Sequence, residues 1–100
     1  MAKRFQITLA QLNPTVGDLE GNYKAALAAW QQAKKMGSDL IAFTELFITG
    51  YNTQDLIKKP SFCKAAQDKI LKLAQTCAEG PAIAIGGPAC IEEKLFNAYY

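Results

Sequence analysis

Leu40-Ile41-Ala42-Phe43-Thr44-Glu45 is the stretch that decides the fold, because a short continuous apolar run leads directly into a carboxylate. The run from Leu40 to Phe43 is typical of a strand that is covered on both faces, as in the parallel sheets of α/β proteins. Open α/β sheets bind their ligands at the carboxyl ends of their strands. The sequence therefore predicts a buried parallel strand with Glu45 at the functional edge of the sheet.

The residues before this run predict the first half of a strand–helix–strand unit. Phe5, Ile7 and Leu9 alternate with polar or small residues, which predicts a strand with these three side chains buried. A helix is expected from about residue 19 to residue 36, with Asp18 as its N-cap and Gly37 just past its end. Its inward stripe, at three- and four-residue steps, is Leu19, Tyr23, Ala26, Leu27, Trp30 and Ala33. The unit should be a right-handed βαβ crossover.

The residues after Glu45 predict a loop and then a second helix and strand. Residues 46–60 show no periodicity, and a loop of that length in a compact chain is often functional. Ser61 is expected to cap the second helix, which Gly80-Pro81 ends. The apolar stripe of that helix is Phe62, Ala66, Ile70, Leu73, Ala74 and Cys77. Residues 82–85 then predict a third buried strand.

The last residues predict a hairpin. Glu92-Glu93-Lys94 has the composition of a turn, and Leu95 to Tyr100 begins another strand. No turn, cap or polar tail follows that strand pattern. The chain is therefore expected to be a piece of a longer protein.

Composition excludes several classes of function. The chain has 100 residues, of which 50% are hydrophobic and 20% charged, as in one small globular domain. A net charge of +2 without long runs of one sign gives no case for nucleic acid or an anionic membrane as partner. No apolar stretch approaches the roughly 20 residues that span a bilayer, and the first residues lack a signal-peptide core, so a cytoplasmic protein is expected. The absence of histidine excludes Ser-His and Cys-His nucleophilic pairs and His-ligated zinc within this chain.

Glu45 is the strongest catalytic candidate. A carboxylate at the end of a buried strand is expected to be partly desolvated, and desolvation raises the pKa of a carboxylate toward the range of a general base. The alternatives are an exposed glutamate that starts a loop, caps a helix or pairs with a lysine. Spacing alone leaves these alternatives open.

The other candidates carry weaker signals. Gly50 is suited to a positive φ, and Tyr51 could line a pocket or simply pack in the loop. Gly86-Gly87 follows a strand but has neither a GxGxxG pattern nor a Walker lysine, so close backbone packing is favoured over a phosphate loop. Cys63 lies in the first turn of the second helix without a base nearby, whereas Cys77 and Cys90 are expected to be small core residues.

Two motifs resemble the nitrilase superfamily of carbon–nitrogen hydrolases. The first is Ala10 to Asp18 with Gly21-Asn22, and the second is Phe43 to Tyr51. The chain is also similar to the N-terminal glutaminase domains of glutamine-dependent NAD+ synthetases, and the residues that carry this similarity are Asp55-Leu56, Lys59 to Phe62, Ile85 to Pro88 and Leu95 to Ala98.

The resemblance implies an α/β fold, the first and incomplete part of a nitrilase-like αββα sandwich. Residues 1–100 would be the N-terminal portion of a single glutaminase domain that stops before the catalytic Lys and Cys of the family. Glu45 matches the family's general base, and Tyr51 matches a position near the glutamine pocket. Neither Lys94 nor Cys90 matches the two missing catalytic residues.

The implied activity belongs to the full-length protein. The family's Cys attacks the glutamine amide, the Lys stabilises the oxyanion, and the released ammonia amidates deamido-NAD+ in a second domain that uses ATP and Mg2+. No cofactor is expected in residues 1–100, which alone should be inactive. A homo-oligomer is expected for the full-length protein.

Two departures from the family pattern affect the loop around Glu45. Thr44 replaces the usual proline, and Asn52-Thr53-Gln54 replaces a run richer in proline and glutamate. Three other interpretations stay open: a stand-alone amidase of the same superfamily, a non-catalytic α/β binding module, and an inactive remnant that is prone to association.

Overall fold

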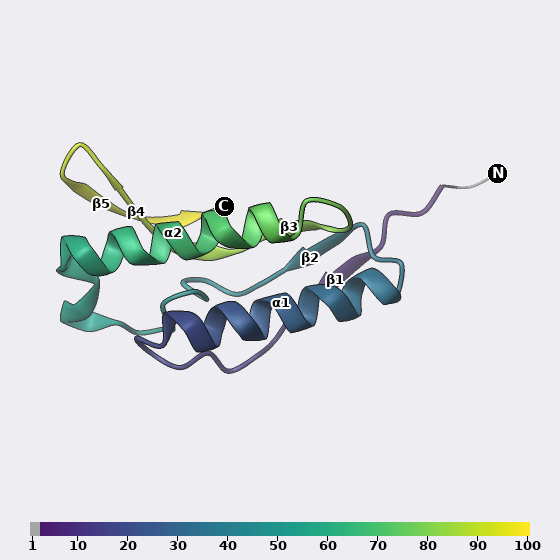
Figure 1. Ribbon diagram of the computed structural model, residues 1–100, viewed down its shortest axis with the longest axis horizontal. Helices are drawn as coiled ribbons and strands as arrows, with labels where there is room; N and C mark the ends of the chain where they lie inside the picture. Colours follow the sequence, from purple (N-terminus) through teal and green to yellow (C-terminus); the bar gives the residue numbers. More distant parts are fainter. Residues whose placement is uncertain (1–2) are drawn as a thin grey trace.

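The computed structural model describes residues 3–100 as two helices and two small sheets, joined by loops and one short 3-10 helix (Figure 1). The elements in chain order are β1 (Ile7–Leu9), α1 (Leu19–Lys35), β2 (Leu40–Ala42), the 3-10 helix η1 (Gln54–Lys58), α2 (Pro60–Thr76), β3 (Ala82–Ala84), β4 (Gly86–Ile91) and β5 (Lys94–Tyr99).

The first three strands form a parallel sheet in the order β1-β2-β3. Ile7 pairs with Leu40, and Leu40 pairs with Ala82, so the three strands are in register. Helix α1 connects β1 to β2, and α2 connects β2 to β3. The prediction of parallel strands joined through helices is therefore confirmed.

The start of α1 was predicted correctly, whereas the start of α2 was not. Asp18 accepts a hydrogen bond from the backbone nitrogen of Gly21 at 2.9 Å, as an N-cap does. Helix α2 has Lys59 at its N-cap and Pro60 in its first turn, so Ser61 lies inside the helix. The reason is that proline fixes φ near the helical value and lacks the amide hydrogen that a first turn leaves unbonded.

Both helices contribute to one core beside the sheet. Ala26 and Ala33 of α1, Ala66 of α2 and Ile41 of β2 are each fully buried, at 0% exposure. The predicted stripe of α1 is confirmed, with Leu19 and Leu27 half-buried against this core. In α2, Phe62 is half-buried and Ala74 is exposed, so the predicted stripe is wrong at Ala74. Neither these helices nor any other in residues 3–100 is long and apolar enough to cross a membrane.

The face of the parallel sheet that points away from the helices is exposed. This corrects the prediction of a buried face on β1 and the prediction that the other two strands are covered on both faces. Phe5, Ile7 and Leu9 are 69%, 51% and 71% exposed, so the predicted buried face of β1 points away from the core. Strands β2 and β3 are covered on one face only. Side chains alternate along a strand, and both helices pack on the side of Ile41, so the alternate positions have no cover.

The last two strands form a separate antiparallel hairpin, as predicted. Glu92 and Glu93 make its turn, with φ values of 50° and 66°. Such positive values match the right-handed twist of the flanking strands in a two-residue loop. The hairpin packs against α2, and it brings β5 back toward the end of β2.

Candidate active site

Glu45 lies just past the carboxyl end of β2, where the parallel sheet meets the start of β4. The backbone nitrogen of Phe43 donates to the carbonyl of Ala84 at 2.8 Å, which extends the pairing of β2 and β3 to the edge of the site. Glu45 itself is exposed. The expectation of partial desolvation is therefore wrong within residues 3–100, because the β4–β5 hairpin that contacts this edge of the sheet leaves the Glu45 side chain exposed.

The chain after Glu45 turns sharply into the core. Phe47, Ile48 and Thr49 are fully buried, and the Thr49 hydroxyl donates to the carbonyl of Leu46 at 3.1 Å. The amide of Ile48 donates to the carbonyl of Gly86 at 3.2 Å. The predicted irregular loop is thus a tightly held segment on the Glu45 side, and it becomes exposed only from Tyr51 onward.

Gly86 is required for the close approach of β4 to Glu45. A Cβ atom at Gly86 would lie 2.7 Å from the carbonyl oxygen of Thr44 and 2.8 Å from the carbonyl carbon of Glu45. Both distances are shorter than side-chain contacts in proteins allow. The interpretation as close backbone packing is therefore confirmed for Gly86, whereas Gly87 packs against the side chains of Ile70 and Ile48.

Asn22 makes three side-chain hydrogen bonds, and one of them ties this segment to α1. Its side-chain nitrogen donates to the carbonyls of Thr15, at 2.8 Å, and Ile48, at 3.0 Å, and its oxygen accepts from the amide of Thr15 at 2.9 Å. Asn22 is only 3% exposed, so these bonds are shielded from water. The bond to Ile48 fixes the backbone three residues after Glu45.

The hairpin holds the Glu45 carboxylate itself. Asn97 of β5 donates from Nδ2 to Oε1 of Glu45 at 2.7 Å. Two residues later, the Tyr99 hydroxyl donates to the carbonyl of Phe43 at 2.7 Å. The carboxylate is thus held by an uncharged amide, and its other oxygen, Oε2, is left to accept a proton.

Sequence reasoning did not identify Asn97 as a site residue. The available signal was its place in Leu95-Phe96-Asn97-Ala98, a stretch that fits the superfamily pattern. An asparagine in a strand after a predicted hairpin turn carries no information about which distant side chain it will meet. That information comes only from the register of β5, in which Asn97 pairs with Pro88.

Tyr51 is placed less tightly than Glu45. Gly50 adopts a φ of 80°, as predicted, and a Cβ atom there would lie 2.6 Å from Cα of Val16. Tyr51 follows it with 65% of its surface exposed. No hydrogen bond or pocket contact in residues 3–100 fixes its ring, so its role near a substrate stays a prediction.

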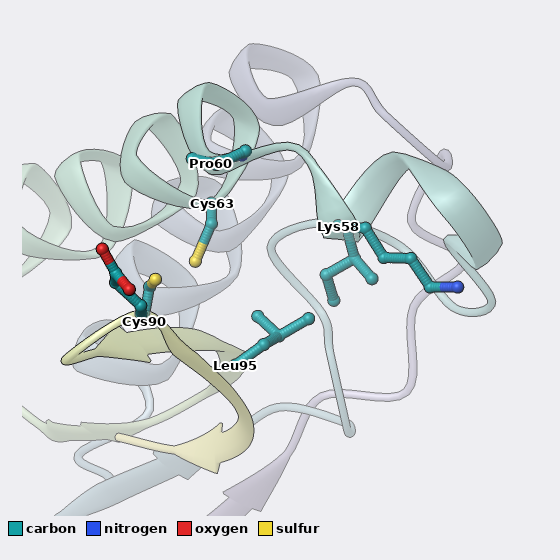
Figure 2. A pocket seen from close by; sticks show the side chains of 7 residues that line it. Lys58, Pro60, Cys63, Cys90 and Leu95 are labelled. Atoms are coloured by element: carbon teal, nitrogen blue, oxygen red, sulfur yellow. The ribbon is translucent and has the colours of Figure 1, made fainter.

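A cavity of about 460 Å³ opens between α2, η1 and the hairpin, and Figure 2 shows its lining. Glu45 does not line it, whereas Cys63 and Cys90 do. Cys63 and Cys77 are buried, but Cys90 is exposed, so the prediction that Cys90 is a core residue is wrong. Cys90 lies beyond the buried start of β4, where the strand leaves the core.

Metal-binding side chains do not gather in the part of the chain that the structure describes. Within residues 3–100, no group of three or more His, Cys, Asp or Glu side chains could hold a metal ion.

Known proteins resemble this chain in sequence and in fold. A glutamine-dependent NAD(+) synthetase from Rhodobacter capsulatus is 50% identical over 100 residues, which are 100% of this chain and 18% of that protein. The crystal structure of a glutamine-dependent NAD(+) synthetase from Cytophaga hutchinsonii superposes with a TM-score of 0.89 at 28% identity, covering 95% of this chain and 16% of that one. The chain thus spans less than a fifth of the length of these relatives.

A more distant structure supports the fold alone. An amidase from Nesterenkonia sp. has a TM-score of 0.73 at 20% identity, with 96% of this chain and 41% of the amidase covered. The sequence profile of the family described as Carbon-nitrogen hydrolase matches residues 6–99. A match over nearly the whole chain, with the same fold in the solved relatives, shows that this chain belongs to the carbon–nitrogen hydrolase family.

Proposed function

We propose that this chain is the N-terminal part of the glutaminase domain of a glutamine-dependent NAD+ synthetase. The observation that carries the proposal is the 50% identity to the Rhodobacter capsulatus synthetase along all 100 residues. The placement of Glu45 supports it, because a carboxylate on a tightly held backbone, with one oxygen bound by Asn97, suits a general base.

In the proposed reaction, a Cys supplied from outside residues 1–100 attacks the amide carbon of glutamine. Glu45 accepts the thiol proton and then delivers it to the departing ammonia. A Lys, also from outside this chain, stabilises the oxyanion. A water molecule that Glu45 deprotonates then releases glutamate from the thioester. Asn97 is a positioning residue that keeps Oε2 of Glu45 directed at the reacting atoms, and Tyr51 is proposed to line the glutamine pocket.

The remaining steps are assigned to a second domain. There ATP and Mg2+ would activate deamido-NAD+ for attack by ammonia. Both ATP and Mg2+ would bind in that second domain. We also propose that the full-length protein is cytoplasmic and forms a homo-oligomer.

The bare sheet face fits this account of the domain. Phe5, Ile7 and Leu9 form an exposed apolar row, and the relatives continue far beyond the part that this chain matches. We propose that a second sheet, formed by residues outside 1–100, covers this row in the complete αββα domain. The intact mass and downstream reading frame of the native gene product test this: a longer chain with a Lys and a Cys at family spacing is expected. A native stop at Tyr100 would contradict it.

The experiment that tests the function compares two nitrogen sources in the full-length protein. Glu45→Gln should lower glutamine-dependent NAD+ formation by about 10²–10⁴-fold, the contribution of a general base. Formation of NAD+ from added ammonium should stay unchanged, because ammonia bypasses the glutaminase step. Glu79→Gln, which alters an exposed carboxylate outside the site, is the matched control. Equal loss with both nitrogen sources would overturn the role of Glu45.

A stand-alone amidase is the second candidate, because the match to the carbon–nitrogen hydrolase family over residues 6–99 does not by itself require a synthetase domain. It requires the full-length protein to hydrolyse small amides and to form no NAD+ from deamido-NAD+, ATP and ammonium. Formation of NAD+ from these substrates would exclude it. A non-catalytic binding module predicts instead that Glu45→Gln leaves ammonia release unchanged.

A further inference from the structure

Two of the three cysteines lie on facing elements although they are far apart in sequence. Cys63 lies in the first turns of α2 and is 1% exposed, whereas Cys90 lies on β4 and is exposed. Both line the same cavity, and Figure 2 shows their sulfur atoms directed toward one another across its floor. Contacts between α2 and β4 place these elements directly against each other.

The Cys90 thiol is part of the immediate surroundings of Cys63. Burial raises the pKa of the Cys63 thiol, and the charge and hydrogen bonding of the neighbouring Cys90 thiol raise the pKa of Cys63 further. The Cys63 sulfur also lies 3.6 Å from Oε1 of Gln67, one helical turn later. Cys63 is therefore a sheltered thiol with a second thiol as neighbour.

We propose that Cys63 and Cys90 form an oxidisable pair that a peroxide converts to an intramolecular disulfide joining α2 to the β4–β5 hairpin. The exposed thiol, Cys90, meets the oxidant first, because it is accessible to solvent and the cavity that it lines also carries the polar side chains Lys58 and Glu93. Cys63 is the resolving thiol, since it is shielded from solvent but adjacent to Cys90.

The proposed steps balance with hydrogen peroxide as the oxidant. The Cys90 thiolate attacks one peroxide oxygen, the O–O bond breaks, and a sulfenic acid and hydroxide form. The Cys63 thiolate then attacks the sulfenic sulfur, the S–S bond forms, and the S–O bond breaks to release water after protonation. In sum, two thiols and one peroxide give one disulfide and two waters.

This modification site is separate from the proposed glutaminase chemistry. Glu45 does not line the cavity, and the proposed nucleophile lies outside this chain. The hairpin nevertheless connects the two places, because Cys90 pairs with Leu95 in the same ladder that pairs Pro88 with Asn97. Oxidation would thus restrict the movement of β4 and β5, the strand pair that contains Asn97, the hydrogen-bond partner of Glu45.

Cys77 provides an internal control. It lies 14 residues after Cys63 in the sequence, and a helical rise over that distance separates the two by about 21 Å. Burial also raises the pKa of Cys77, whose second influence is Lys34 and not a thiol. A buried thiol without a thiol neighbour should stay reduced under the same treatment.

The test maps disulfides in the full-length protein. The protein is treated with hydrogen peroxide, its remaining thiols are blocked with N-ethylmaleimide under denaturing conditions, and it is digested without reduction for mass spectrometry. Trypsin leaves Cys63 on residues 59–64 but Cys77 and Cys90 together on residues 73–94, so a second cleavage after Glu79 is required. The expected product links residues 59–64 to a peptide that begins at Gly80, and dithiothreitol should abolish it.

Three variants sharpen the result. The linked peptide should be lost in Cys90→Ser and in Cys63→Ser but retained in Cys77→Ser. Mapping in the unmutated protein does not depend on the folding of any variant. Conversion of Cys90 to its sulfinic acid while Cys63 stays labelled by N-ethylmaleimide would overturn the proposal. So would a link from Cys63 to Cys77, or a link that forms only when peroxide is added in urea.

Discussion

Glu45 is held by two regions of the molecule that differ in kind. The first, which we call the backbone anchor, comprises Asn22, Gly86 and residues 46–50, and its Ile48 and Thr49 are fully buried. The second, the hairpin anchor, comprises Asn97 and Tyr99 of β5, and Tyr99 is 57% exposed. The position of the Glu45 main chain thus depends on contacts shielded from water. The orientation of its carboxylate depends on a two-stranded ribbon at the surface.

The largest effect on stability is expected at the backbone anchor. Asn22→Ala removes three hydrogen bonds and leaves the buried carbonyl of Ile48 without its side-chain donor, whereas the Thr15 carbonyl keeps the amide of Asp18 as a donor. We expect a loss of about 2–4 kcal/mol in the free energy of unfolding, since one unsatisfied buried carbonyl costs about 1–3 kcal/mol and each of the other lost hydrogen bonds about 1 kcal/mol. Urea denaturation measures it, with Asn13→Ala at an exposed position as control. A loss no larger than that of the control would show that the backbone anchor does not hold this segment.

A smaller effect is expected at the hairpin anchor. Tyr99→Phe keeps the ring but removes the hydroxyl that donates to the carbonyl of Phe43. The expected loss is about 1 kcal/mol, as for a typical single hydrogen bond. Tyr51→Phe is the control for stability, because Tyr51 is exposed. If Tyr99→Phe destabilised the protein as much as Asn22→Ala, the contrast between the two anchors would be wrong.

The smallest effect is expected outside both anchors, at the ion pair between Glu20 of α1 and Lys69 of α2. The hydrogen bond from Lys69 lowers the pKa of the Glu20 carboxyl, so the pair stabilises the fold above the unfolded-state pKa of Glu20. That stability is lost as the pH falls through the lowered folded-state pKa. Glu20→Gln should therefore lower the Tm slightly at pH 7, and this difference should shrink as the solution is acidified.

Salt distinguishes this surface pair from the buried anchors. The Tm difference between Glu20→Gln and the unmutated protein at pH 7 should shrink in about 1 M NaCl, where the Debye length is about 3 Å. The loss in Asn22→Ala should persist under the same conditions. A Glu20→Gln difference that was unchanged by both salt and acid would rule out an electrostatic origin.

Much of the fold was predictable because local rules decide it. The stripe of α1, the Asp18 cap, the parallel strands and the Glu92-Glu93 turn all follow from periodicity and turn chemistry. The start of α2 was wrong because Ser61 and Pro60 compete for the first turn, and proline at the first helical position prevails. The buried face of β1 was wrong because alternation shows that a strand has two faces but not which face the helices cover.

The candidate site was predictable only in part. Glu45 could be found from its place after a buried strand, which is a local signal. Its partner Asn97 is 52 residues away, and the register of the hairpin brings the two together. Cys90 was misplaced for a related reason: β4 leaves the core partway along its length, and composition does not show where.

The measurement that tests the account most directly is a double-mutant cycle on glutamine hydrolysis by the full-length protein. If Asn97 acts by orienting Glu45, Asn97→Ala should lower kcat about tenfold, or about 1.4 kcal/mol, when Glu45 is present. In a Glu45→Gln background, Asn97→Ala should cause no further loss, and ammonium-dependent NAD+ formation should be unaffected throughout. An equal tenfold loss in both backgrounds would contradict the account, because Asn97 would then act independently of Glu45.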